Sequence, residues 1–77
     1  MGFFMQIRPE VLKKLREDYP AGCEVELISM NDPYRDMPPG MHGKVLFVDD
    51  AGGVHIAWKN GSTLAALHGI DLIRRVV

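Results

Sequence analysis

The side chains best suited to hold a metal ion in this sequence are three histidines and a single cysteine. His42, His55 and His68 follow one another at intervals of 13 residues, and Cys23 lies well before the first of them. Two metal ligands on one element are normally two residues apart on a strand or four apart on a helix, because those spacings place both side chains on one face. No two of these residues have such a spacing. We therefore expect ordinary surface or partly buried imidazoles, no metal site and no cofactor.

The acidic and hydroxyl side chains do not form a recognisable catalytic set. General acid–base catalysis requires carboxylates that face each other across a cleft, and a nucleophilic serine requires a base within hydrogen-bond distance. Asp49 and Asp50 begin a turn, where aspartate is typical because its side chain accepts hydrogen bonds from turn amides. Ser62 shares a hairpin with His55, but nothing in their spacing directs the two side chains together. We therefore expect no enzymatic activity and assign no catalytic residue.

Methionine, proline and aromatic residues gather in a long loop and beside a neighbouring hairpin. Methionine is an adaptable apolar side chain that recurs at binding sites, and small β-domains bind extended peptides with such surfaces. We expect a groove for a protein or peptide ligand lined by Met30, Asp32, Tyr34, Met37, Pro39, Met41 and Trp58. The alternative is that these side chains fold inward and plug one end of the domain. Trp58 is in phase with Val54 and Ile56, which favours burial of most of its ring.

Nucleic acid is the alternative class of partner. Single-stranded nucleic acid binds where exposed aromatic rings lie among lysines and arginines. The candidates for such a surface are Tyr34, Arg35, Lys44, Trp58, Lys59, Arg74 and Arg75. Asp32, Asp36, Asp49 and Asp50 lie among them, and the chain has a formal net charge of −1. Because this balance gives no long-range attraction for phosphate, we favour a protein or peptide partner.

The length of 77 residues allows one compact core, so we expect an N-terminal arm at residues 1–8 and a single domain at 9–77. Pro9 and Glu10 are typical of a first helical turn. Apolar residues recur after them at helical spacing, at Val11, Leu15 and Tyr19, and Pro20 stops the pattern. The sequence therefore predicts one short amphipathic helix over residues 9–19.

The arm contains Phe3, Phe4 and Met5, which we expect either to cover an edge of the domain or to form a homodimer contact. It lacks the basic stretch and cleavage site of a signal peptide, and the chain has no apolar run of membrane-spanning length. With only one cysteine, the chain suits a reducing compartment. We therefore expect a cytoplasmic protein that does not contact membranes.

From Gly22 onward, the apolar period changes from helical spacing to the alternation of strands. Residues 23–27, 44–49, 54–59, 62–67 and 72–76 are predicted to form five strands, of which 44–49 is apolar on both faces and therefore central. Asn60-Gly61 predicts a type I′ turn, and residues 69–71 a single helical turn. Closing such a small sheet would remove its exposed edges. The predicted fold is mainly β, a small SH3-like five-stranded barrel over residues 22–77 with one short N-terminal α-helix.

Many positions of the chain match the pattern of one family of small bacterial proteins. They are Arg16, Tyr19, Pro20, Gly22, Val25, Glu26, Leu27, Met30, Asp32 and Pro33, then Pro38, Gly40, Gly43, Val45, Val48, Asp49, Gly53, His55, Trp58, Asn60, Gly61, Ser62, Leu64, Gly69 and Asp71. On these residues the chain resembles the family known as domain of unknown function 4314. The family has no assigned activity, so the resemblance implies a small SH3-like barrel and adds no function. From the residues themselves, we expect a non-catalytic interaction module.

Overall fold

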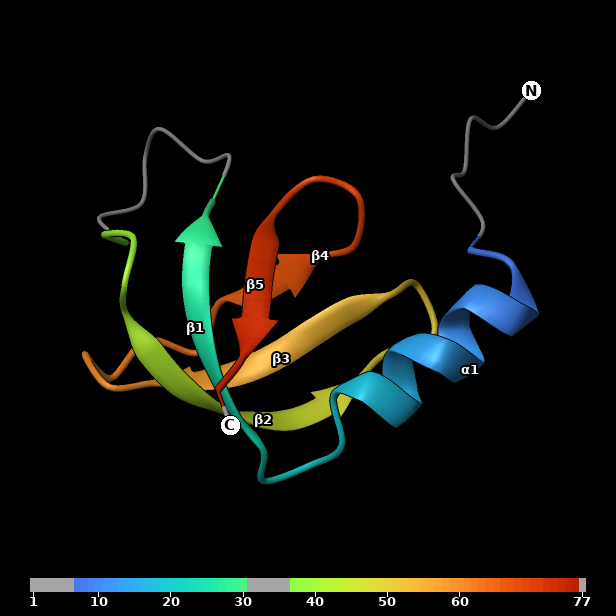
Figure 1. The fold of residues 1–77 in the computed structure, drawn as a ribbon, viewed down its shortest axis with the longest axis horizontal. Coiled ribbons are helices and arrows are strands. Elements are labelled where there is room, and N and C mark those ends of the chain that lie inside the picture. Colours follow the sequence, from blue (N-terminus) through green and yellow to red (C-terminus); the bar gives the residue numbers. More distant parts are fainter. Residues whose placement is uncertain (1–6, 31–36, 77) are drawn as a thin grey trace.

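The computed structural model describes residues 7–30 and 37–76, in which one helix precedes five strands (Figure 1). The elements are α1 (Pro9–Asp18), β1 (Glu24–Ser29), β2 (His42–Val48), β3 (Gly53–Trp58), β4 (Ala65–Leu67) and β5 (Leu72–Arg75). The prediction of a mainly β chain with one short N-terminal helix is therefore confirmed. The expected helix and five strands all occur, with shifts at their ends.

The five strands form one antiparallel sheet in the order β4-β3-β2-β1-β5. β2 is the middle strand, as its apolar sequence predicted. The register sets Val45 opposite Ile56 and Val54 opposite Ala66, and all four side chains are buried on the same face. Because side chains alternate along a strand, this register directs the intervening residues Lys44, His55 and Ala57 to the opposite face of the sheet.

The sheet formed by the described residues is not closed, so the barrel expected from the sequence is not confirmed. β4 and β5 lie at its two edges, and no ladder joins them in this part of the chain. The Leu67 N–H donates to Asp71 Oδ2 (2.9 Å), and the Leu67 carbonyl accepts from the N–H groups of Ile70 and Asp71. On β5, the Ile73 carbonyl accepts a hydrogen bond from the Tyr19 hydroxyl (3.4 Å). These local contacts occupy backbone groups at both edges and protect them from pairing with other chains.

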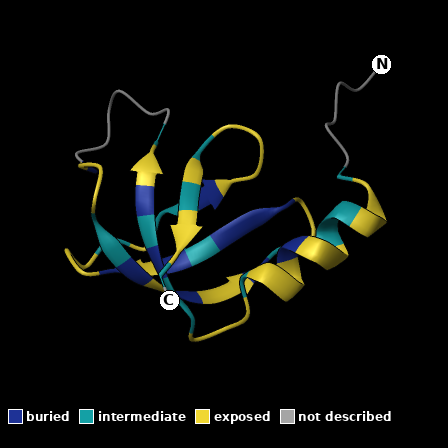
Figure 2. Cartoon of the chain, in the orientation of Figure 1, coloured by how far each residue is buried: buried dark blue, intermediate teal, exposed yellow. Residues whose placement is uncertain are grey.

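The hydrophobic core lies on the inner face of the sheet, with contributions from α1 and from the segment before β2 (Figure 2). Its buried members are Leu15, Val25, Leu27, Met37, Val45, Val48, Val54, Ile56, Trp58 and Ala66. Val25 and Leu27 alternate along β1 with Glu24 and Glu26, which face outward, as the period-two pattern predicted.

Helix α1 covers the core through Leu15, with Leu12 partly buried beside it. It begins at Pro9, where a missing N–H costs nothing, and Glu10 is favourably placed at the positive end of the helix dipole. The helix ends at Asp18, one residue earlier than expected, because the following Tyr19 leaves the helical conformation just before Pro20. The part of the chain that the structure describes includes no helix of the length and apolarity needed to cross a membrane.

The turn between β3 and β4 differs from the expected type I′ turn. A type I′ turn needs positive φ angles at both central residues, but Gly61 (φ 89°) has a positive φ and Asn60 does not. The Gly61 N–H donates to the Trp58 carbonyl (3.0 Å), and the Trp58 N–H donates to the Ser62 carbonyl (2.9 Å). This is the pattern of a type I turn followed by a glycine bulge. The Asn60 side chain stabilises it by accepting a hydrogen bond from the Ser62 N–H (3.0 Å).

Two further segments near β4 depart from the expected strands and turns. β4 begins at Ala65 and not at residue 62, because the Leu64 N–H donates to Ser62 Oγ (3.3 Å) and the Leu64 carbonyl accepts from the indole of Trp58. Residues 69–71 form a hydrogen-bonded turn and not a helical one, since Gly69 has a φ of 82°.

Candidate interaction groove

The residues expected to line a ligand groove fall into four groups. Asp32 and Tyr34 lie outside the described residues. Met37 and Trp58 are buried in the core, while Met30 and Met41 are half-buried and pack against it. Pro39 is exposed. The described methionines therefore contribute apolar contacts to the domain itself, and the open surface at this end belongs largely to other residues.

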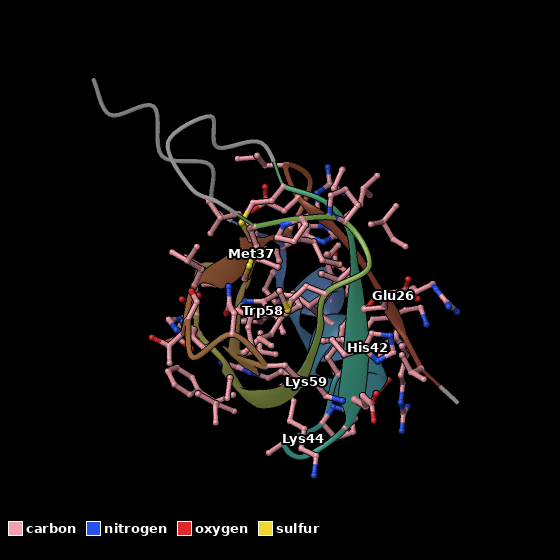
Figure 3. The ribbon with its side chains drawn as sticks, turned by 90° about the vertical axis from the view of Figure 1, so that its left-hand side faces the viewer. Glu26, Met37, His42, Lys44, Trp58 and Lys59 are labelled. Atoms are coloured by element: carbon pink, nitrogen blue, oxygen red, sulfur yellow. The ribbon has the colours of Figure 1, made fainter. Side chains whose placement is uncertain are left out.

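Trp58 lies in the interior, among the strands in Figure 3, and Met37 belongs to the same buried cluster. Its side chain is only 3% exposed, and its indole N–H donates to the Leu64 carbonyl (2.9 Å). The ring is therefore buried, as the phase of the strand predicted, and its polar atom is satisfied. A ligand at the surface does not reach this ring.

The segment entering β2 is joined to both neighbouring elements. The Gly40 N–H donates to the Leu27 carbonyl (2.8 Å), and the Leu27 N–H donates to the Met41 carbonyl (2.8 Å). On the other side, Asn60 Nδ2 in the hairpin turn lies 3.5 Å from Met37 Sδ, within hydrogen-bond reach of sulfur. These contacts fix the position of the loop end relative to the turn between β3 and β4.

An open groove of about 460 Å³ lies where this segment faces the hairpin turn. It is lined by Pro38, Pro39, Gly40, Met41, His42 and Lys59, which we call the proline groove. The two prolines and Gly40 are exposed, and Met41 supplies a half-buried apolar side chain. The expected groove residues Pro39 and Met41 are thus brought together. His42 and Lys59 were not expected here; the Lys59 N–H donates to the His42 carbonyl (3.0 Å), and this backbone pairing holds the two residues together.

Charged side chains lie beside the proline groove, among them His42 and Lys59 in Figure 3, and they are only partly paired. His42 Nδ1 lies 2.6 Å from Glu24 Oε2, and this hydrogen bond holds the pKa of Glu24 below its ordinary value. Glu26 forms an ion pair with Arg74. Among the described residues, no ion-pair partner lies within reach of Lys44 or Lys59, although their charges also help to lower the pKa of Glu24. The rim of the groove therefore presents an exposed ammonium group at Lys59.

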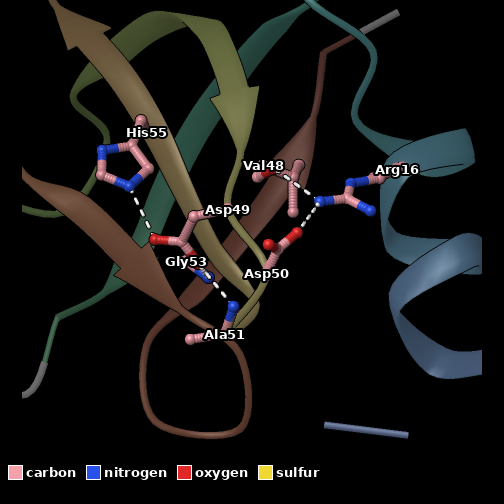
Figure 4. A network of polar contacts seen from close by, with 7 residues as sticks. All are labelled: Arg16, Val48, Asp49, Asp50, Ala51, Gly53 and His55. Carbon is pink, nitrogen blue, oxygen red and sulfur yellow. Dashed lines mark hydrogen bonds and ion pairs between the residues drawn. The ribbon is translucent and has the colours of Figure 1, made fainter. Parts of the chain in front are cut away.

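A second polar cluster surrounds the turn between β2 and β3 (Figure 4). Asp49 Oδ1 accepts hydrogen bonds from the backbone N–H groups of Ala51 (3.0 Å) and Gly53 (2.8 Å), as expected for an aspartate that begins a turn. Its other oxygen, Oδ2, lies 2.7 Å from His55 Nε2. The hydrogen bond from His55 is the main reason that the pKa of Asp49 lies below its ordinary value. The carboxylate has partners on both oxygens, so it stabilises the turn.

The same turn is tied to the helix by Arg16. One guanidinium nitrogen of this side chain, Nη2, donates to the Val48 carbonyl (3.2 Å) and to Asp50 Oδ1 (2.8 Å), as Figure 4 shows. On the solvent face of the sheet, Phe47 stacks on His55 with ring centroids 4.2 Å apart and ring planes inclined by 10°. These contacts give Arg16 and His55 a structural role in holding the turn and the helix in place.

The histidines do not converge. His42 is paired with Glu24 and His55 with Asp49, while His68 lies beside α1 and lines cavities there. Within residues 7–30 and 37–76, no three side chains of histidine, cysteine, aspartate or glutamate lie close enough together to hold a metal ion. Cys23 is a half-buried free thiol, and burial raises its pKa, which disfavours a reactive thiolate.

The family assignment follows from a match that spans almost the whole described chain. The family model for a domain of unknown function, DUF4314, matches residues 8–76, which include α1, all five strands and the proline groove. No curated protein and no solved structure matches the chain. The chain therefore belongs to the DUF4314 family.

Proposed function

We propose that the protein is a non-catalytic interaction module that binds an extended segment of another protein in the proline groove. The observation that carries this proposal is the combination, at one place, of exposed prolines, a half-buried methionine and the exposed ammonium group of Lys59. Proline supplies rigid apolar contact at a low cost in conformational entropy, methionine supplies an adaptable apolar surface, and the lysine favours a carboxylate. The ligand that fits is therefore an extended peptide with apolar side chains and one acidic group.

The strand order supports a finer fold assignment and, with it, this binding mode. β1 lies between β2 and β5, and β2, β3 and β4 follow as a meander, which is the arrangement of SH3-like barrels. We propose that the domain folds as an SH3-like barrel. In such domains, extended peptides bind beside the long first loop and the turn of a later hairpin, where the proline groove lies. We also propose that the protein is bacterial and cytoplasmic, and that it works without a cofactor and without membrane contact.

A peptide-binding assay with a matched pair of lysine variants tests the proposal. Fluorescently labelled ten-residue peptides that combine prolines with one central glutamate are titrated with the protein, and anisotropy is recorded. Lys59→Ala should weaken binding of the glutamate peptides about three- to tenfold, as expected for a partly exposed charge contact worth roughly 1 kcal/mol. Lys13→Ala on the exposed face of α1 is the control and should bind as the parent protein does. Equal binding by all three proteins would contradict the assignment of the groove.

A second candidate function, binding of single-stranded nucleic acid, is favoured by one observation on the solvent face of the sheet. Phe47 is 53% exposed and stacks on His55, and Lys44 is exposed on the same strand. An exposed ring near a cation suits a nucleotide base and its phosphate. Trp58, which the sequence offered for this role, is buried. Titration with mixed oligonucleotides at low salt tests this candidate, since binding should weaken with added salt and in Phe47→Ala.

A further inference from the structure

An apolar groove lies on the other side of the domain, between α1 and the turn that follows β4. Two adjoining cavities of about 510 Å³ and 520 Å³ share Val11 and His68. We call their apolar floor and walls the α1 groove and define it by Ile7, Val11, Leu15, Leu67, His68 and Ile70. It shares no residue with the proline groove, so an inference about it is independent of the proposed function.

The walls of the α1 groove include large apolar side chains that are exposed to solvent. Leu67 is 46% exposed and Ile70 is 49% exposed, and both face the cavity beside Val11. Clustered exposed apolar side chains are costly in water and normally mark a contact surface. The rim carries charges of both signs, and Lys14 and Asp18 are paired with each other (3.4 Å). The groove therefore suits an uncharged apolar occupant more than a charged one.

The chain itself enters the domain at this groove. Ile7 lines the cavity and packs against the turn between β2 and β3, where a Cβ added to Gly52 would lie 2.8 Å from Ile7 Cδ1. Gly52 also has a φ of 86°, so both its backbone and its missing side chain favour this close approach. Ile7, the first described residue after the N-terminal segment, therefore lies at the mouth of the groove.

The segment that precedes Ile7 has the composition and the reach to fill the groove. Residues 1–6, with Phe3, Phe4 and Met5, lie outside the described residues; they read MGFFMQ, with two phenylalanines, two methionines and no charged side chain. Six residues in extended form span about 20 Å, whereas a ten-residue helix is about 15 Å long. The segment can therefore run along the whole length of α1 from its attachment at Ile7.

We propose that the α1 groove binds the N-terminal segment of its own chain, with Phe3 and Phe4 packed against Val11, Leu67 and Ile70. This contact covers apolar surface that the sheet and helix leave exposed. It also removes the phenylalanines of the segment from water, which is favourable for each buried aromatic side chain. Attachment at Ile7 makes the association intramolecular, so the segment competes well against binding from a second chain.

Nuclear Overhauser contacts in an isotopically mixed sample test the proposal. Protein with labelled phenylalanine rings is mixed with an equal amount of protein with labelled isoleucine, leucine and valine methyl groups, and the spectra are compared with those of a doubly labelled chain. We expect contacts from Phe3 and Phe4 to methyls of Val11, Leu67 and Ile70 in the doubly labelled chain, and none in the mixture. Absence of these contacts in both samples, or contacts in the mixture that show exchange of the segment between two chains, would overturn the proposal.

A variant experiment gives an independent reading of the same contact. The double variant Phe3→Ser/Phe4→Ser should shift the amide resonances of Val11 and residues 67–70 and raise the fluorescence of a bound hydrophobic dye. The matched control is Phe47→Ser, which removes an exposed ring from the solvent face of the sheet and should leave the α1 groove resonances unchanged. Shifts confined to residues 7 and 8 in the double variant, with no change in dye binding, would also contradict the proposal.

Discussion

Substitution of Gly43 by alanine is a sharp test of how β1, β2 and β3 pack. Gly43 lies in β2, opposite Val25 of β1 and Trp58 of β3, and is buried. A Cβ at this position would lie 2.6 Å from Ile56 Cγ2, 2.9 Å from the Ala57 carbonyl oxygen and 3.0 Å from Trp58 Cε3. Ordinary carbon–carbon contacts are about 3.5–4.0 Å, so the added methyl group overlaps the fully buried Ile56 by about 1 Å.

The expected cost follows from which of these neighbours can move. The Ala57 carbonyl belongs to the backbone of β3, which pairs with β2, and Ile56 is enclosed by the core, so neither yields easily. Overpacking of this kind costs about 1–3 kcal/mol, and the reduced freedom of the unfolded chain returns about 0.4–1 kcal/mol. We therefore expect Gly43→Ala to lower the free energy of unfolding by about 1–2 kcal/mol and the melting temperature by roughly 5–15 °C.

Urea unfolding followed by tryptophan fluorescence measures this change, because the single Trp58 is buried and reports the transition. Gly61→Ala is the matched control: its Cβ meets no atom within 4 Å, and only its φ of 89° opposes the substitution. It should cost about 1 kcal/mol without altering core resonances. A free energy of unfolding for Gly43→Ala within about 0.5 kcal/mol of the parent value would refute this description of strand packing.

Three further predictions concern the polar contacts. His42 and His55 hold the pKa values of Glu24 and Asp49 below their ordinary values, so the stabilisation that these two carboxylates contribute is fully present above about pH 4.5 and is lost as the pH falls through the lowered values. Urea unfolding of Asp49→Asn between pH 7 and 3 should therefore show a flatter pH dependence of stability than the parent protein. An identical slope would contradict this. Arg16→Ala removes hydrogen bonds to Val48 and Asp50 and should lower the free energy of unfolding by about 1 kcal/mol, and Arg16→Lys should recover only part of this loss. An unchanged melting temperature in a thermal melt of Arg16→Ala would show that these hydrogen bonds contribute nothing. Trp58→Phe keeps an aromatic ring in the core but leaves the Leu64 carbonyl without its donor, so the free energy of unfolding should fall by about 1–3 kcal/mol. Unfolding followed by circular dichroism measures this change, and an unchanged unfolding transition would argue against the hydrogen bond.

The elements of the fold could be predicted because they follow from local patterns. The spacing of Val11 and Leu15 is helical, the alternation of Val25 and Leu27 is that of a half-buried strand, and Pro20 marks the end of the helix. Closure of the sheet into a barrel, which the described residues do not confirm, depends on contacts between residues whose geometry the pattern does not specify. The side chain of Asp71 accepts the edge N–H of Leu67, and such contacts decide whether the edges of a sheet pair.

The candidate site was predictable only in part for the same reason. The proline and methionine content of the loop identified Pro39 and Met41 as groove residues, because composition can be read along the chain. Lys59 joins them only because its backbone N–H pairs with the His42 carbonyl across two strands, and that register is set by the whole sheet. The phase of Trp58 did predict its burial, since alternation on β3 is a local property.

Chemical-shift mapping tests most directly whether the proline groove binds an extended acidic segment. Isotopically labelled protein is titrated with an unlabelled peptide that combines prolines and a glutamate, and the backbone amide resonances are followed to saturation. Saturable shifts should cluster at Gly40, Met41, His42 and Lys59 and diminish in Lys59→Ala. No shifts, or shifts confined to the α1 groove or to the solvent face around Phe47, would contradict the account.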